Sequence, residues 1–339
     1  MILAQAIERV TEGGELSREE SRAVIAGTLV AGFEEERLAD LLTRLAARGE
    51  TAAEIAGGAD ALRDAMIPFE HDHADAIDTC GTGGDGTSTF NLSTAAAIVA
   101  AAAGARVVKH GNRSQSSRCG SADLLEAAGI PLDLPPDRSK AVLDEVGITF
   151  LFAPAHHPAL QHAAPVRKAL GVRTIFNFLG PLANPGRVRR QLVGVPEPRR
   201  VEELAAALAE LGHESAYVVH GAGGADELTL AGENLVAAVG QAPVQRFDAQ
   251  ALGLARAPVA QLRGGDAAAN LRLLRLVLAG EANAILDAVL MNAAAALIVA
   301  GVAADASDGV RRAGEAIASG RAKDTMSRWV DAARRARSS

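Results

Sequence analysis

From about residue 70 onward, short apolar segments alternate with longer segments of helical periodicity, and this alternation limits the possible folds more than any other feature of the chain. Strands are expected over residues 76–79, 105–111, 148–153 and 215–221. Helices are expected near residues 93–103, 121–128, 137–146, 158–170 and 198–211. Strands that alternate with helices are typical of an α/β domain with a central, mostly parallel sheet flanked by helices.

The two ends of the chain show helical patterns instead. Residues 1–66 contain two capping-box sequences, Ser17–Glu20 and Thr51–Glu54, in which a hydroxyl and a glutamate satisfy free backbone amides at a helix start. Pro68 ends this run, and residues 267–337 are again expected to be helical. A chain of 339 residues is long enough for about two domains, so a small N-terminal helical domain is expected beside the α/β domain.

The composition argues against several classes of protein. A formal net charge of −7 gives no general attraction for nucleic acid or for an anionic membrane, so a bound anion needs a local site. Residues 288–304 are rich in alanine and include Asn292, which favours a buried helix over a membrane span. The first residues lack the basic start and apolar run of a signal peptide, and Cys80 and Cys119 form no disulfide framework. A soluble, cytoplasmic protein is expected.

Three of the expected strands end in a glycine-containing loop. The three loop sequences are DTCGTGG, VKHGNR and VHGAGG. In open α/β sheets, ligands bind outside the carboxyl ends of the strands. The three loops are therefore expected to meet at one crevice, although they lie far apart in the sequence.

The first loop, DTCGTGGDGTSTFNLST, contains four glycines and seven hydroxyl side chains. Its glycines match the dinucleotide fingerprint G-x-G-x-x-G, but the acidic residue that should follow about 20 positions later is missing, and the P-loop spacing is absent too. Asn91, Ser93 and Thr94 stand where the next helix is expected to begin. A helix start offers free N–H groups and a partial positive charge, which favours a phosphate site over a simple hydroxyl cap.

The second loop carries Lys109, His110, Asn112, Arg113 and Arg118, and no acidic residue occurs over positions 86–122. Solvated basic surfaces usually intersperse acidic residues. In an acidic chain, this interval indicates a local site for a small polyanion.

The third loop contains two adjacent carboxylates, Asp226 and Glu227. By themselves they are more typical of a solvated turn. Opposite a phosphate site they would repel the ligand unless a cation lay between, and Mg²⁺ is commonly held by one or two carboxylates together with substrate phosphates. The third loop is therefore predicted to bind magnesium.

Several longer motifs, in one order, carry a family resemblance. GTGGDG, NLST, KHGNR, GSADLLEAAG, HHPAL and VRKALGVRTIFNFLGPLANP, followed by DEL, resemble the anthranilate phosphoribosyltransferase family over residues 1–335. The related pyrimidine nucleoside phosphorylases share the fold and a similar KHGNR loop, but they are not expected to carry the segment from Arg173 to Pro185. This chain departs from the family pattern at Ser114-Gln115, Cys119 and Ala225, and none of these changes removes a charged residue that the chemistry needs.

The resemblance implies a fold of the nucleoside phosphorylase/phosphoribosyltransferase type. It implies a small helical domain over residues 1–67, joined by a segment near 165–185, a large phosphoribosyl-binding domain over 74–338, and a homodimer. It also implies the substrates phosphoribosyl pyrophosphate (PRPP) and anthranilate, two Mg²⁺ ions per subunit, and a role in tryptophan biosynthesis.

The family motifs imply a role for individual residues of this chain. The PRPP-binding residues are expected to be Gly81, Thr82, Gly83, Gly84, Asp85, Thr89, Asn91, Ser93, Thr94, Lys109 and Ser121. The anthranilate-binding residues are expected to be Gly81, His110, Asn112, Arg167 and Pro181. The metal ligands are expected to be Ser93, Asp226 and Glu227, and the catalytic residues Lys109, Asp226 and Glu227.

Two other functions stay open at the level of the sequence. One is a pyrimidine nucleoside phosphorylase-like enzyme that uses inorganic phosphate, and the other is a non-catalytic relative that binds nucleic acid, which the net charge of −7 disfavours. His156, His157 and His162 could suggest a zinc site, but no cysteine or carboxylate is close to them in sequence. They are expected to begin a helix before Pro158 and to line the channel for the aromatic acid.

Overall fold

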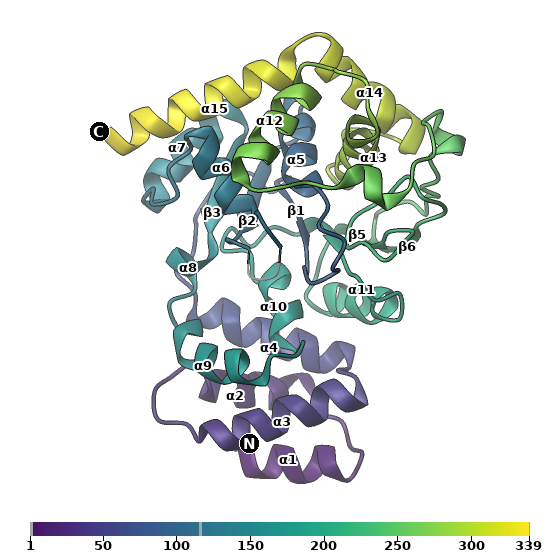
Figure 1. The fold of residues 1–339 in the computed structure, drawn as a ribbon. Helices are drawn as coiled ribbons and strands as arrows, with labels where there is room; N and C mark the ends of the chain where they lie inside the picture. The colour runs from purple at the N-terminus through teal and green to yellow at the C-terminus, as the bar shows by residue number, and fades with distance from the viewer. Residues whose placement is uncertain (1–2, 115–116, 339) are drawn as a thin grey trace.

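The structure is a computed structural model that describes residues 3–114 and 117–338. Its first four helices are α1 (Leu3–Thr11), α2 (Arg18–Gly27), α3 (Glu35–Arg48) and α4 (Ala52–Ala65). Both predicted capping boxes form, at Ser17 with Glu20 and at Thr51 with Glu54. These four helices build one end of the molecule in Figure 1.

The rest of the chain is built around one six-stranded sheet in the order β3-β2-β1-β4-β5-β6. The strands are β1 (Ile77–Gly81), β2 (Val107–Gly111), β3 (Ile148–Phe152), β4 (Arg190–Gly194), β5 (Ser215–His220) and β6 (Leu235–Gly240). Neighbouring strands are parallel except for β6, which pairs antiparallel with β5 at the edge. The predicted α/β fold with a mostly parallel sheet and an N-terminal helical domain is confirmed.

The remaining helices connect and cover the strands. They are α5 (Leu92–Ala102), α6 (Ser121–Ala128), α7 (Pro136–Val146), α8 (Ala153–His156), α9 (Leu160–Leu170), α10 (Phe176–Leu182), α11 (Arg200–Glu210), α12 (Ala267–Leu278), α13 (Ala284–Val299), α14 (Ala306–Ala318) and α15 (Arg321–Ser338). Two short 3₁₀ helices, η1 (Gln250–Leu252) and η2 (Val259–Leu262), precede α12.

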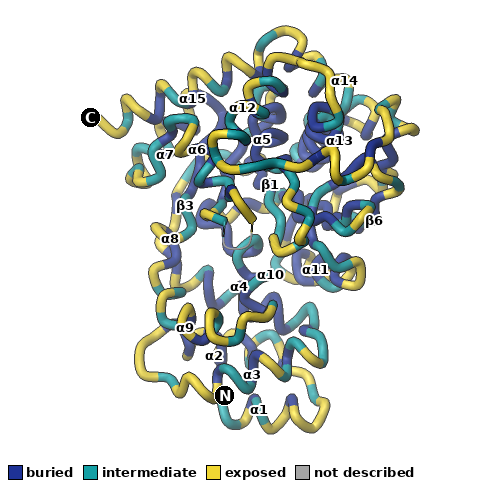
Figure 2. Tube along the Cα trace, viewed as in Figure 1, coloured by how far each residue is buried: buried dark blue, intermediate teal, exposed yellow. Residues whose placement is uncertain are grey.

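The two faces of the sheet belong to two different hydrophobic cores. On one face, Tyr217 and Val219 pack in the core that contains α5 and α13, and both of these helices are buried in Figure 2. On the other face, Ala216 and Val218 pack with α11, α10 and α4. Successive side chains of a strand point to opposite faces. The N-terminal helices and α13 therefore pack on opposite faces of the same strand.

Two strands and two α-helices of the described residues were not expected from the sequence. β4 and β6 were missed, and α8 and α10 lie where no helix was predicted. The expected strand over 76–79 begins and ends later, as β1, so that Cys80 lies on a strand and not in the phosphate loop. β4 separates β1 from β5, and the third glycine loop must therefore reach across the end of β4 to meet the first.

Within the described residues, the model contains no helix with both the length and the apolar character that a membrane span requires.

Candidate active site

The strand order defines where a ligand can enter the sheet. The chain passes from β1 to β2 and β3 on one side, and then returns to place β4 on the other side of β1. The carboxyl ends of β1 and β4 therefore form a topological switch point, where the two connecting loops diverge and leave a crevice. Gly81 and Gly194 end these two strands.

The third loop meets the first loop at this point. The Asp226 carboxylate accepts a hydrogen bond from the Gly83 N–H, with 2.7 Å between N and Oδ2. The Glu227 carboxylate accepts one from the Ser93 N–H in the first turn of α5, at 2.8 Å, and the Thr89 hydroxyl donates to its other oxygen at 3.5 Å. The two adjacent carboxylates thus touch both the glycine loop and the helix start that follows it.

Two glycines permit this close approach. A Cβ atom added at Gly81 would overlap the Asp226 carboxylate, and one added at Gly194 would overlap the backbone carbonyl of Asp226. Gly194 was not identified from the sequence, because the strand that it ends was missed. Its signal was present as a glycine within the short apolar run Leu192–Val195.

The carboxylates form an acidic cluster inside the crevice. Burial raises the pKa of Asp226 to about 7, and the charge of Asp85 acts in the same direction. Burial likewise raises the pKa of Glu227 to about 8, with the charge of Asp226 as the second cause. Asp85 itself accepts hydrogen bonds from the backbone N–H and the hydroxyl of Thr87. A cation placed among these groups would relieve their mutual repulsion.

The donor atoms in this cluster fit a hard divalent cation. Carboxylate and hydroxyl oxygens are the ligands that Mg²⁺ prefers, and Mg²⁺ usually keeps several water or phosphate ligands in addition. No group of three histidine, cysteine, aspartate or glutamate residues among the described positions is arranged as a complete metal site. The geometry therefore agrees with a partial ligand set that substrate phosphates would complete.

The start of α5 presents two of the residues that were predicted to bind phosphate. The hydroxyl oxygen of Thr94 is buried and has no hydrogen-bond partner among the described residues. Asn91 is differently engaged, since its amide donates to the Cys119 carbonyl at 3.0 Å and accepts from Asn270 at 2.8 Å. Asn270, a buried residue of α12, was not predicted as a site residue.

Lys109 and His110 lie at the carboxyl end of β2, and both are buried. The Lys109 amine donates to the Thr79 carbonyl of β1, and the His110 backbone N–H donates to the Asp78 carboxylate at 3.2 Å. Burial, followed by the neighbouring His157, holds the pKa of His110 well below its usual value. The two imidazole rings are 5.1 Å apart, and the Nε2 atom of each is buried without a partner among the described residues.

The second loop carries less unpaired positive charge in the structure than its sequence suggested. Arg113 forms ion pairs with Asp123 at 2.9 Å and with Glu126 at 2.8 Å, so α6 neutralises it. The predicted acid-free basin is therefore wrong for Arg113, because the compensating acids follow the loop in sequence and fold back onto it. The Ser121 hydroxyl donates to the Asn112 carbonyl at 3.3 Å, which joins the start of α6 to the end of β2. Gln115 lies outside the described residues.

The residues expected to bind the aromatic acid come from α9 and α10. The Arg167 guanidinium lies 5.2 Å from the centre of the Phe176 ring, and burial lowers its pKa. None of the described carboxylates forms an ion pair with it, so the guanidinium is available for an external carboxylate. Pro181 lies within α10, and its carbonyl accepts a hydrogen bond from the Gln191 side chain at 2.6 Å.

Arg173, between α9 and α10, is a further residue that was not predicted for the site. Its guanidinium donates to the Gly83 carbonyl and, at 3.0 Å, to the Thr82 hydroxyl of the glycine loop. The Thr82 N–H in turn donates to the Gly194 carbonyl at 2.9 Å. Gly84, the next residue of the loop, has a positive φ of 75° and leaves no room for a Cβ beside Arg173.

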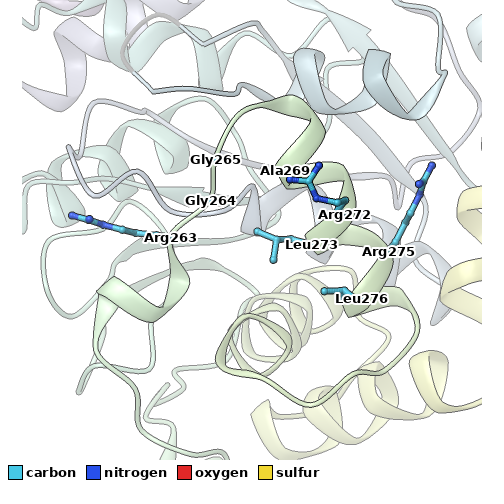
Figure 3. A pocket seen from close by; sticks show the side chains of 8 residues that line it. All are labelled: Arg263, Gly264, Gly265, Ala269, Arg272, Leu273, Arg275 and Leu276. Atoms are coloured by element: carbon cyan, nitrogen blue, oxygen red, sulfur yellow. The ribbon is translucent and has the colours of Figure 1, made fainter.

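One hollow that the described residues line lies beside α12 and not over the carboxylates. Its volume is about 530 Å³, and its lining includes Arg263, Arg272 and Arg275. Figure 3 shows that the Arg263 side chain points away from the other two arginines, so the three do not converge on one anion. A much smaller cavity shares Gly264 and Gly265 with this hollow and touches Thr89 of the glycine loop.

Matches to family models define the class of protein to which the chain belongs. The family model described as the glycosyl transferase family, a/b domain, matches residues 73–323, and the model of the helical bundle domain of the same family matches residues 4–66. The chain thus matches both domain models of one glycosyl transferase family.

Individual relatives that align over nearly their whole length identify the family within this class. An anthranilate phosphoribosyltransferase of Novosphingobium aromaticivorans is 48% identical over 94% of this chain and 96% of its own length. The crystal structure of the Thermus thermophilus enzyme of the same name has a TM-score of 0.92 at 44% identity, covering 97% of this chain and 99% of that one. The Saccharomyces cerevisiae enzyme in complex with PRPP and Mg has a TM-score of 0.88 at 26% identity, covering 98% and 97%. The chain belongs to the anthranilate phosphoribosyltransferase family, which confirms the predicted resemblance.

Proposed function

We propose that this protein transfers the phosphoribosyl group of PRPP to the amine of anthranilate, giving N-(5-phosphoribosyl)anthranilate and pyrophosphate in tryptophan biosynthesis. The observation that carries the proposal is the contact of Asp226 and Glu227 with the glycine loop and with the first turn of α5. Relatives of nearly the same length, at 45–49% identity, bear the name of this activity.

The first loop, β2 and α6 are assigned to PRPP. The proposed contacts are Gly81, Thr82, Gly83, Gly84, Asp85, Thr89, Asn91, Ser93, Thr94, Lys109 and Ser121. The partner-free hydroxyl of Thr94 and the N-terminus of α5 support this assignment, because both can donate to phosphate oxygens. The assignment of Asn91 to PRPP has less support, because its side-chain amide already donates one hydrogen bond and accepts another within the protein.

The assigned metal ligands are Ser93, Asp226 and Glu227, and the raised pKa values of the two carboxyls support the need for a cation there. The yeast relative, which has a structure with PRPP and Mg, supports magnesium as the ion. We propose two Mg²⁺ ions per subunit. When bound, Mg²⁺ would neutralise charge on the pyrophosphate of the substrate.

Arg167, His110, Asn112, Gly81 and Pro181 are assigned to anthranilate. A guanidinium pairs with a carboxylate through two parallel hydrogen bonds, and Arg167 has no such partner of its own among the described residues. The lowered pKa of His110 keeps its imidazole neutral, so that it can lie beside an aromatic ring without adding charge. A complex of the yeast relative with 4-fluoroanthranilate supports this class of ligand.

The reaction is a displacement at the anomeric carbon. The lone pair of the aromatic amine forms the new C–N bond, the bond from that carbon to the pyrophosphate oxygen breaks, and one amine proton is lost to solvent. The neutral amine already carries its lone pair, so no general base is required for attack. Charge builds up on the departing pyrophosphate, where Lys109 and the amides at the start of α5 would stabilise it. The residues assigned to PRPP and to anthranilate hold the two substrates in position for the reaction.

The fluorescence of anthranilate provides the test. We expect it to fall when the protein is mixed with anthranilate, PRPP and Mg²⁺, and to stay constant when PRPP is left out or a chelator is added. A matched reaction with a pyrimidine nucleoside and inorganic phosphate should release no free base. Constant anthranilate fluorescence in the complete mixture, or release of base from the nucleoside, would refute the proposed function.

Three further features complete the proposal. A small domain of residues 1–67 with the segment near 165–185, and a large domain of 74–338, are supported by the packing of α9 on α3 and of α10 on α4. Closure between them would bring the two substrates together. We also propose a homodimer and a location in the cytoplasm, which sedimentation and cell fractionation would test.

A further inference from the structure

The Arg173 side chain connects two parts of the site that are distant in sequence. It belongs to the turn between α9, which carries Arg167, and α10. In Figure 1, α9 lies alongside the N-terminal helices, and α10 lies between α4 and the sheet. Its guanidinium leaves this turn and donates to the Gly83 carbonyl and to the Thr82 hydroxyl.

The Gly83 peptide is consequently held from both sides. Its N–H donates to the Asp226 carboxylate at 2.7 Å, and its carbonyl accepts from Arg173. Gly83 and Gly84 both have positive φ angles, of 69° and 75°, which only glycine adopts readily. A run of such residues is costly to order, so external contacts have to fix its conformation.

Other contacts hold the guanidinium in place. Its Nε atom lies 3.5 Å from the Glu197 carboxylate, and its Cζ atom lies 5.8 Å from the centre of the Phe178 ring. The Arg173 side chain is 25% exposed. Glu197 also interacts with Arg199, at 3.7 Å, but that arginine is 68% exposed and makes no contact with the glycine loop among those described.

We propose that Arg173 is a positioning residue that holds the glycine loop against Asp226, so that the loop is ready to bind the pyrophosphate of PRPP. The proposal rests on the proposed function. It makes the turn between α9 and α10 part of the PRPP site, although the same segment carries the residue assigned to the anthranilate carboxylate. Arg173 acts through the loop and does not have to touch the reacting atoms.

The test compares Arg173→Ala with Arg199→Ala, which removes an arginine from the same glutamate but leaves the loop untouched. For Arg173→Ala we expect a KM for PRPP raised by about ten- to a hundredfold, the scale of one hydrogen bond to a charged group. The Mg²⁺ concentration for half-maximal rate should also rise, while the KM for anthranilate changes less than about threefold. Arg199→Ala should match the wild type. Arg173→Lys, which keeps the charge but loses the two-pronged donor, should lie between the wild type and Arg173→Ala.

Hydrogen exchange of the ligand-free proteins supplies a readout that needs no activity. Peptides covering residues 81–90 should exchange faster in Arg173→Ala than in the wild type or in Arg199→Ala. Unchanged exchange there, equal kinetic effects of both alanine variants, or a parallel rise in both KM values with a lowered melting temperature would overturn the proposal. If the wild type lacks transferase activity but the loop exchanges as expected, the proposed function fails and the positioning of the loop by Arg173 stands.

Discussion

Replacing Asp226 by asparagine should make the metal-free protein more stable at alkaline pH while making it a worse enzyme. The wild-type carboxyl is buried beside Glu227 and close enough to Asp85 for their charges to interact, and these neighbours raise its pKa from 3.8 to about 7. A carboxyl with a raised pKa in the folded state destabilises the fold progressively as the pH rises from the unfolded-state pKa to the folded-state pKa, because only the unfolded chain ionises it in that range. Asparagine has no charge to bury and can still accept the Gly83 hydrogen bond.

The size of the effect follows from the pKa. A difference of about three pH units corresponds to about 4 kcal/mol, at about 1.4 kcal/mol per unit. Neutralising Asp226 also removes the second cause of the raised pKa of Glu227, whereas local opening of the crevice to water limits the penalty in the wild type. We therefore expect a net stabilisation of about 2 kcal/mol at pH 8.5, or roughly 3 °C in the melting temperature. At pH 5 we expect less than about half of this stabilisation, because the unfolded chain already ionises the carboxyl there but the difference in ionisation has built up over only part of its pH range.

Thermal unfolding in the presence of a chelator, at pH 5 and at pH 8.5, measures this difference. The pH 5 value for each protein serves as its reference, because the larger part of the penalty builds up between pH 5 and the folded-state pKa of about 7. The double variant Asp226→Asn with Glu227→Gln should in addition lose about a hundredfold or more in kcat at saturating Mg²⁺, the scale of lost transition-state charge stabilisation. The electrostatic account would be refuted if the variant were less stable than the wild type at pH 8.5. It would also be refuted if the difference in stability between variant and wild type were the same at both pH values.

Three other substitutions test other parts of the structure. Arg167→Ala should raise the KM for anthranilate by about tenfold or more and leave that for PRPP nearly unchanged; a selective rise for PRPP would mean that the residue serves the other substrate. Gly194→Ala should abolish Mg²⁺-dependent turnover, since its Cβ would overlap the Asp226 carbonyl, and normal turnover would contradict the packing at the end of β4. Thr51→Ala should remove a capping box and cost about 1 kcal/mol in urea denaturation, with both KM values unaffected.

The sequence was most informative where a local pattern alone determines the geometry. The start of α5 follows from the polar run before an alanine-rich helix, and the two capping boxes follow from hydroxyl and glutamate spacing. The contact between Asp226 and the glycine loop could also be predicted from the sequence, because parallel strands present their carboxyl ends at one edge of the sheet.

The features that were missed depend on contacts between distant segments. β4 is only five residues long and follows a basic stretch, so nothing near it separates it from a loop. The neutralisation of Arg113 comes from acids ten and thirteen residues later, which only the fold-back of α6 reveals. Arg173 reaches a loop 90 residues earlier in the chain, and no periodic pattern encodes such a contact.

The C-terminal helices explain how the catalytic loops keep their shape in a chain with so few large core residues. Asn292 lies in α13, the most thoroughly buried helix, and its amide accepts from the Leu228 N–H at 3.1 Å and donates to the Leu228 carbonyl at 2.8 Å. Asn270 of α12 similarly fixes Asn91 at the start of α5. A buried amide is costly unless all of its hydrogen bonds are made. Each asparagine therefore favours the one loop conformation that satisfies its amide. Asn292 fixes the residue after Glu227, and Asn270 fixes the start of α5, so the two hold Glu227 and α5 in a defined relative position.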